Sequence, residues 1–172
     1  MEDIFVVRQQ GGLTDDELRA ALEQSLQGRN LRRVLIIPPD FTRFHSQAGK
    51  ITNLYYHLLK ARDVLVDILP ALGTHAPVTK EQWQLMYGDI PYECMMIHDW
   101  RRDVLRLGEV PAEYVKQVTE GLWQDPVDVE INRRIMDPAY DLIISPGQVV
   151  PHEVVGMANH AKNLFVGVGG NG

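Results

Sequence analysis

Short, almost continuously apolar runs recur along the chain, and each is bounded by proline, glycine or polar residues. The predicted strands of this kind cover residues 33–37, 64–69, 93–97, 141–145 and 163–168. Runs this short and this apolar are typical of strands that are covered on both faces, as in a parallel sheet. The length of 172 residues suits a single domain built around such a sheet.

Helical patterns stand between the first of these runs. Residues 14–27 and 47–61 place apolar side chains at helical spacing, and capping-box patterns open helices at Thr14 and Thr79. Strands that alternate with helices predict an α/β fold with a doubly wound, mostly parallel sheet and helices on both faces. Alternating polarity within residues 104–135 predicts some antiparallel strands in that region.

The charge balance limits the partners of the protein. The formal net charge is −6 and the arginine pairs are scattered, so a basic groove for nucleic acid is not expected. No apolar run approaches the ~20 residues that span a bilayer, and the acidic start does not fit a signal peptide. The single cysteine excludes an internal disulfide. The sequence thus predicts a cytoplasmic protein that binds neither membrane nor nucleic acid.

Four polar clusters follow predicted strands, at the carboxyl ends where open α/β sheets bind ligands. They are residues 40–43, 73–75, 98–99 and 147–152. Because the carboxyl ends of parallel strands meet at one edge of a sheet, the sequence predicts a shared cleft there. The side chains expected around it are Asp40, Arg43, His75, His152 and Lys162.

The first two clusters carry groups suited to anion binding and proton transfer. Asp40 precedes Thr42 and Arg43, so its carboxylate can orient an anion-binding guanidinium. The same residues also fit a capped helix start with a solvated arginine. Thr74 and His75 lie in a glycine turn, where an imidazole either transfers protons near neutral pH or serves as a hydrogen-bonded loop residue.

The later clusters differ in what they predict. His98 and Asp99 are adjacent and would point to opposite faces of a strand, which favours a structural role over a paired base and acid. Pro151 is expected to start a helix with His152 in its first turn. Lys162 follows a stretch of small residues and is either a desolvated nucleophile or a lysine at the C-terminal end of a helix.

Taken in order, these motifs resemble the N-terminal domain of the nickel-pincer lactate racemase family. The shared motifs are DxTR at 40–43, ALGTH at 71–75, an HD pair at 98–99 and D-x-x-I-x-x-G-x-x-x-PH at 141–152, followed by Lys162. Each motif is short, but the order and spacing match across essentially the whole chain.

The resemblance implies a racemase or epimerase of a small 2-hydroxy acid that acts by reversible hydride transfer. It implies a lysine-tethered nickel-pincer nucleotide, pyridinium-3,5-bisthiocarboxylic acid mononucleotide nickel, as the cofactor. Residues 1–172 would form a single α/β domain, the N-terminal, cofactor-tethering domain of a longer two-domain enzyme whose C-terminal domain is absent. The implied partners are the 2-hydroxy acid substrate, that C-terminal domain and the enzymes of cofactor synthesis.

The resemblance also implies which side chains act on the substrate. His75 and His152 match the family's two acid/base histidines. Asp40 and Arg43 match its DxTR motif, in which the arginine would grip the substrate carboxylate or a nearby polar group. These four residues are the expected catalytic group.

The cofactor is expected to contact a different set of residues. Lys162 matches the family's tethering lysine, and Thr42 and Thr74 are expected to contact the cofactor. The family's nickel-binding histidine would fall downstream of Gly172, so no metal ligand is expected within this chain. His160 is not favoured as a substitute ligand.

The chain departs from the family pattern at two places near the expected site. Ala76 stands where the family often has an arginine, and residues 156–160 read Gly-Met-Ala-Asn-His in place of a glycine-rich run. Both changes favour a substrate other than lactate. Without a second domain, the isolated chain is expected to fold but not to catalyse.

Two other functions compete with the racemase hypothesis. In a nucleotide- or phosphate-binding module, Arg43 and Thr74 would hold a phosphate and Lys162 would stay unmodified. An NAD-type dehydrogenase is disfavoured, because no G-x-G-x-x-G motif follows a strand and precedes a helix.

Overall fold

Helices alternate with strands in the first half of this computed structural model, which describes residues 3–170. The elements there are α1 (Asp15–Ser25), β1 (Arg33–Ile36), α2 (Ala48–Lys60), β2 (Leu65–Ile68) and α3 (Lys80–Tyr87). The second half contains β3 (Val104–Val110), α4 (Ala112–Val118), β4 (Val127–Asn132), β5 (Leu142–Ile144), β6 (Pro151–His152) and β7 (Gly156–Met157). Short 3₁₀ turns lie at Phe41–Ser46, Tyr92–Cys94 and Arg133–Met136, and a π-helix lies at Asn163–Gly167.

Three parallel strands form the central sheet, in the order β2-β1-β5. Val34 of β1 stands opposite Val66 of β2 on one side and Leu142 of β5 on the other. The predicted α/β class with a parallel sheet is therefore confirmed. Because the strands run in the same direction, the loops that follow β1, β2 and β5 leave from one edge of the sheet.

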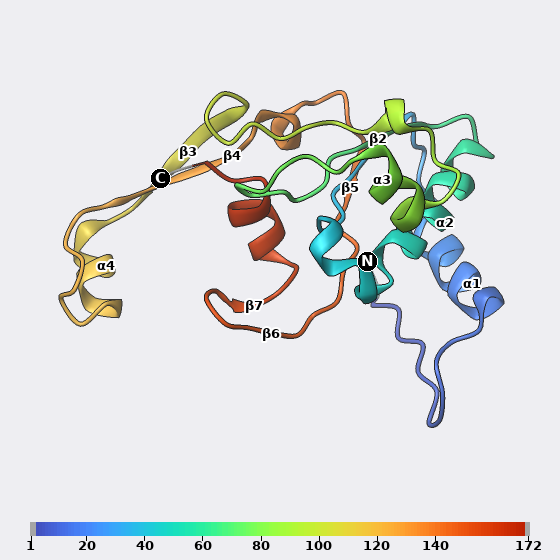
Figure 1. Cartoon of the computed structure of the whole chain (residues 1–172), viewed down its shortest axis with the longest axis horizontal. Coiled ribbons are helices and arrows are strands. Elements are labelled where there is room, and N and C mark those ends of the chain that lie inside the picture. Colours follow the sequence, from blue (N-terminus) through green and yellow to red (C-terminus); the bar gives the residue numbers. More distant parts are fainter. Residues whose placement is uncertain (1–2, 171–172) are drawn as a thin grey trace.

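Alternate residues of β1 face two different packing layers. Val34 and Ile36 pack in the larger layer with side chains of α1, α2 and α3. These three helices lie together on one side of the molecule (Figure 1). Leu35 and Ile37 face a smaller layer, partly closed by the π-helix and by the 3₁₀ turn that precedes β5. Both faces of the central sheet are therefore covered, one by α1, α2 and α3 and the other by short helical turns.

Two helices begin at the capping boxes that the sequence predicts. The hydroxyl of Thr14 accepts the backbone N–H of Glu17, and the Glu17 carboxylate accepts the backbone N–H of Thr14. Thr79 and Gln82 make the same reciprocal pair at the start of α3. Each pair satisfies backbone donors that the first turn of a helix leaves free.

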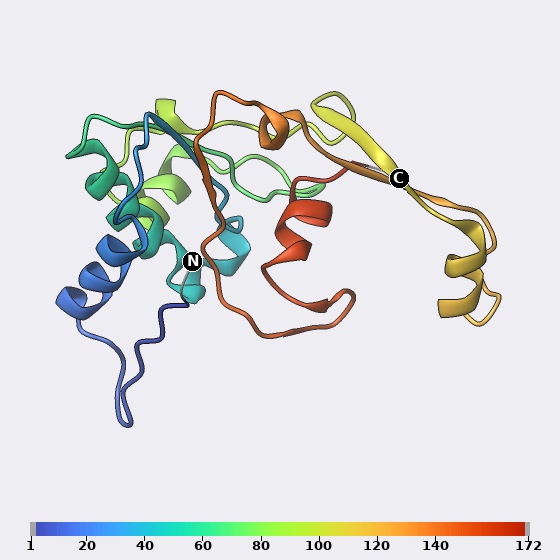
Figure 2. The same ribbon diagram turned by 180° about the vertical axis from the view of Figure 1, so that it is seen from behind.

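β3 and β4 form an antiparallel ribbon that projects from the body, with α4 near its far end (Figures 1 and 2). This ribbon confirms the antiparallel strands predicted within residues 104–135. The sequence does not predict α4, because seven residues are too few to display a clear helical period. Gly169 forms an antiparallel bridge with Ile131 at the base of the ribbon.

The strand predicted at residues 93–97 is not formed. The 3₁₀ turn Tyr92–Cys94 occupies its first part, and Met95 then makes only an isolated parallel bridge with Ile68. The backbone N–H of Met96 donates to the Ile68 carbonyl at 2.7 Å. The segment therefore lies beside β2 without the continuous ladder of a strand.

The strand predicted at residues 163–168 is also wrong, because this run is a π-helix. The backbone N–H of Val168 donates to the carbonyl of Asn163 at 3.0 Å. Gly167 packs against Ala71 so closely that an added Cβ would lie 2.5 Å from the Ala71 side chain. The sequence of this segment is typical of a strand, but the segment is helical where it packs against Ala71. Local sequence patterns do not reveal such a tertiary contact.

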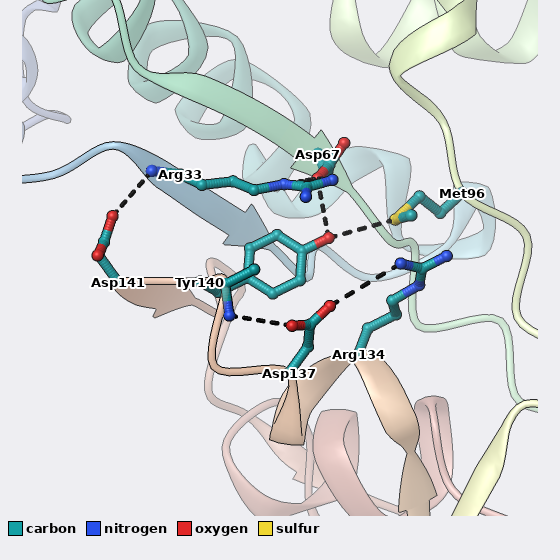
Figure 3. A network of polar contacts seen from close by, with 8 residues as sticks. Arg33, Asp67, Met96, Arg134, Asp137, Tyr140 and Asp141 are labelled. Atoms are coloured by element: carbon teal, nitrogen blue, oxygen red, sulfur yellow. Dashed lines mark hydrogen bonds and ion pairs between the residues drawn. The ribbon is translucent and has the colours of Figure 1, made fainter.

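A polar network joins the strands near the amino ends of β1 and β5 (Figure 3). Asp67 of β2 accepts the Arg33 guanidinium, at 2.7 Å for the closest pair, and the Tyr140 hydroxyl at 2.8 Å. Asp141 accepts the backbone N–H of Arg33 at 2.9 Å. Burial, followed by the bond to Asp67, raises the pKa of Tyr140 to about 12. The network thus connects β1 and β2 to the residues that precede β5.

Candidate functional site

The loops that follow β1, β2 and β5 line one cleft at the carboxyl edge of the sheet, together with the start of the π-helix. Its volume is about 710 Å³, within the range of roughly 300–1,000 Å³ typical of ligand and cofactor sites. All seven side chains that the sequence predicts for catalysis or cofactor binding line this cleft: Asp40, Thr42, Arg43, Thr74, His75, His152 and Lys162.

Asp40 is the most buried of these side chains, with 7% of its surface exposed. One carboxylate oxygen accepts the backbone N–H and the hydroxyl of Thr42, so Asp40 caps the 3₁₀ turn that follows β1. The other oxygen contacts Nδ1 of His75. The sequence prediction that Asp40 orients the Arg43 guanidinium is wrong, because the carboxylate is used by Thr42 and His75.

His75 is held in the turn after β2 and remains open to the cleft. Gly73 takes the positive φ of 57° that this turn requires, and its N–H donates to the Gly167 carbonyl at 2.7 Å. The His75 side chain is 61% exposed, although its Nδ1 contacts buried Asp40. A carboxylate accepts only, so neutral His75 carries its proton on Nδ1 and presents an Nε2 lone pair. This is the arrangement of an oriented general base.

His152 is held in the opposite tautomer. Its Nδ1 accepts the backbone N–H groups of Val154 at 3.1 Å and Val155 at 3.4 Å. Neutral His152 therefore carries its proton on Nε2, as a hydrogen-bond donor. The helix predicted from Pro151 is wrong, because Pro151 and His152 pair with β7 in a tight hairpin that closes at Gly156 with φ 79°.

Lys162 lies at the amino end of the π-helix, which excludes the second of the two alternatives, a lysine at a helix C-terminus. A cation gains nothing from the helix dipole at that end. Within residues 3–170, neither the Lys162 ammonium nor the Arg43 guanidinium has a hydrogen bond or an ion pair. The pKa of the exposed Glu153 is lowered mainly by its own backbone hydrogen bond and by His152. The charges of Arg43 and Lys162 lower it further. Two cations without bonded partners thus line the cleft.

An apolar wall completes the cleft, and sequence reasoning missed it. It is formed by Trp100, Val154, Val155, Phe165 and Val166. The indole of Trp100 also stacks on the Arg101 guanidinium, 3.6 Å from Cζ to the ring centroid. An isolated tryptophan after the HD pair is the sequence signal that points to this wall.

His98 does not line the cleft and has structural contacts instead. It is 5% exposed, its Nε2 donates to the Gly169 carbonyl at 2.9 Å, and its Nδ1 accepts the Asn132 side-chain amide at 3.0 Å. Burial lowers the pKa of His98 below its ordinary value of 6.5. The neutral imidazole thereby joins β4 to the segment after the π-helix.

Acidification is expected to destabilise the protein through His98. Because the folded-state pKa lies below 6.5, this stability is complete above pH 6.5 and is lost as the pH falls towards the lower folded-state value. His98→Gln, which keeps a donor and an acceptor, should remove that loss. The loss of stability is measured as the difference between the melting temperatures at about pH 7.5 and about pH 5. The exposed His45→Gln serves as control, and equal acid sensitivity of His98→Gln and wild type would show that His98 is not the source.

Neither a metal cluster nor a membrane-spanning helix occurs among the described residues. Across residues 3–170, no group of three or more histidine, cysteine, aspartate or glutamate side chains is placed to hold a metal ion. Over the same part of the chain, no helix combines the length and apolar character that crossing a bilayer requires.

Comparison with known proteins gives one family match and several structural matches. The profile of the lactate racemase N-terminal domain family matches residues 15–172. A crystal structure of a Thermotoga maritima protein superposes with a TM-score of 0.83 at 23% identity, covering 92% of this chain and 39% of that one. The lactate racemase apoprotein of Thermoanaerobacterium thermosaccharolyticum superposes with a TM-score of 0.63 at 20% identity, covering 89% and 37%. No curated protein matches the sequence.

Proposed function

The chain belongs to the lactate racemase N-terminal domain family, and we propose that it is part of an isomerase that inverts the hydroxyl-bearing carbon of a small 2-hydroxy acid. The observation that carries this proposal is the pair of histidines in one cleft, held in opposite tautomers by Asp40 and by the β6–β7 turn.

The two histidines are suited to moving the hydroxyl proton in both directions. Nε2 of His75 accepts the proton of a substrate hydroxyl and, as the imidazolium, returns it to the same oxygen, while Nε2–H of His152 donates a hydrogen bond to that oxygen. Inversion requires the carbon to be approached from both faces, and two imidazoles from different loops can contact the substrate oxygen in either orientation.

Arg43 is the group best placed to hold the substrate carboxylate. Its guanidinium lines the cleft and has no acidic partner within residues 3–170, so both of its outer N–H groups are available. A guanidinium binds a carboxylate through two parallel hydrogen bonds, which fixes orientation as well as position. The apolar side chains of the cleft would then contact the remainder of the substrate.

The residues of the cleft fit a lysine-tethered nucleotide such as the nickel-pincer nucleotide. Lys162 offers an amine that no acidic group engages among the described residues, and the volume of about 710 Å³ accommodates a mononucleotide. Lys162 would carry the covalent attachment, and the hydroxyls of Thr42 and Thr74 would contact the group. When bound, such a cofactor supplies the hydride acceptor that the side chains lack.

The chain is proposed to be the cofactor-tethering domain of a longer two-domain enzyme. It covers 39% and 37% of the two solved structures that it resembles. The nickel-binding histidine and the remaining wall of the cleft would come from sequence beyond Gly172. Its partners would be that second domain and the enzymes that make the cofactor.

Intact mass spectrometry of the full-length protein, coexpressed with cofactor-synthesis enzymes, tests this function. The expected result is a mass adduct that maps to Lys162, together with interconversion of 2-hydroxy acid enantiomers in a chiral assay. The competing phosphate-binding module is favoured by the two cations without bonded partners, Arg43 and Lys162. Saturable binding of inorganic phosphate by a protein that never acquires an adduct would support that module instead.

A further inference from the structure

Two consecutive residues before Lys162 adopt the left-handed backbone conformation. Asn159 has φ 62° and His160 has φ 48°. Side chains with a Cβ rarely adopt this region, and asparagine tolerates it better than most. Two such residues in succession persist only where surrounding contacts hold them. The contacts of Asn159 therefore decide how the chain enters the π-helix.

The Asn159 side chain closes a triangle of hydrogen bonds. Its Oδ1 accepts the Ser145 hydroxyl at 3.1 Å and the Asn163 amide at 2.9 Å. The Asn163 amide also donates to the Ser145 hydroxyl oxygen at 3.2 Å. Ser145 follows β5, and Asn163 is buried at the start of the π-helix. The triangle thus ties the end of the sheet to the helix.

Two further contacts connect Asn159 to the cleft. Its carbonyl accepts the backbone N–H of Lys162 at 3.0 Å. Gly147 lies so near that an added Cβ would be 2.8 Å from the Asn159 side chain, so the glycine leaves room for the amide. Asn159 and Lys162 also share a small pocket beside the main cleft, which Gly147 and Asn163 help to line.

We infer that Asn159 is a positioning residue that fixes the backbone of Lys162 at the cleft. Within residues 3–170 no bonded partner restrains the Lys162 ammonium, so the direction of this half-buried side chain depends on its backbone. That the direction of the Lys162 side chain matters for cofactor attachment rests on the proposed function. The positioning itself rests on the left-handed turn and the hydrogen-bonded triangle.

Four substitutions separate the backbone contribution of this residue from its side-chain contribution. Asn159→Asp keeps an oxygen acceptor for both bonds and tolerates the left-handed conformation. Asn159→Gly keeps the backbone conformation but loses the triangle, and Asn159→Ala loses both. His160→Gly is the matched control, because it relieves the neighbouring left-handed residue and removes no side-chain hydrogen bond among the described residues.

The test measures the chemical exposure of Lys162 in full-length protein made without the cofactor-synthesis enzymes. Limited acetylation and peptide mass spectrometry give the rate at Lys162 relative to exposed Lys116. Asn159→Ala should raise this ratio by about tenfold, as expected from the loss of two hydrogen bonds. Asn159→Asp and His160→Gly should stay close to wild type. In cofactor-loaded cells, the adduct fraction should fall in Asn159→Ala and recover in Asn159→Asp.

The outcomes separate this inference from the proposed function. An unchanged acetylation ratio in Asn159→Ala would overturn the positioning role. If Asn159→Ala fails to fold, Asn159→Gly decides, since its ratio must still rise while Lys116 reacts at the wild-type rate. A changed ratio in a protein that never carries an adduct would support the positioning of Lys162 and reject the cofactor proposal.

Discussion

Replacing Lys162 with arginine is expected to abolish both the cofactor adduct and racemisation in the full-length enzyme. A guanidinium keeps the positive charge but cannot readily form the thioamide that tethers the cofactor. The folded structure should change little, because the ammonium has no hydrogen bond or ion pair within residues 3–170. A change of no more than about 0.5 kcal/mol in the free energy of unfolding is expected for such a substitution. Intact mass, a chiral assay and thermal melts measure these three properties.

Lys116→Arg, on the exposed face of α4, is the matched control and should keep both adduct and activity. If Lys162 had only a structural role, Lys162→Arg would have little effect, because another cation would replace the lysine. Full activity in Lys162→Arg, with no adduct ever seen on the wild type, would leave the phosphate-binding module as the better hypothesis. The structure already removes one structural role, since Lys162 does not stand at the carboxyl end of a helix.

The sheet and its helices could be predicted because their signals are local. The apolar runs at β1, β2 and β5 and the capping boxes at Thr14 and Thr79 depend on residues within a few positions of one another. The cleft followed from the same strands, because parallel strands place their carboxyl ends at one edge. Sequence periodicity was therefore sufficient to place the side chains that follow β1 and β2, Asp40 and His75 among them, at one edge.

The parts that could not be predicted depend on distant contacts. The π-helix at Asn163–Gly167 has a strand-like sequence, and its close packing on Ala71 spans almost a hundred positions. The sequence predicts a helix at His152 because proline often starts one, whereas the pairing of β6 with β7 keeps His152 extended. The prediction that Asp40 orients Arg43 is wrong for the same reason. Arg43 is nearer in sequence, but the chain turn after β2 brings His75 to the carboxylate.

The pairing of Asp40 with His75 leads to the second large effect, which is expected for Asp40→Asn. An asparagine amide can donate to Nδ1, and the imidazole would then carry its proton on Nε2 and lose its ability to accept one at the cleft. The turnover number should fall by about 10²–10⁴, the usual effect of losing a positioned acid/base group. KM should change little, because asparagine keeps the cap of the 3₁₀ turn that contains Arg43.

Stability distinguishes this catalytic effect from a folding defect. Asp40 also caps the 3₁₀ turn, and asparagine caps as well as aspartate does, so Asp40→Asn should melt close to wild type. Asp40→Ala loses both the cap and the orientation of His75, and should lose stability as well as turnover. Asp89→Asn is the matched control, because Asp89 contacts His57 at 2.9 Å outside the cleft and should leave activity unchanged. Wild-type turnover in Asp40→Asn would mean that His75 does not need Asp40 to act as a base, and the opposed tautomers could then no longer explain inversion.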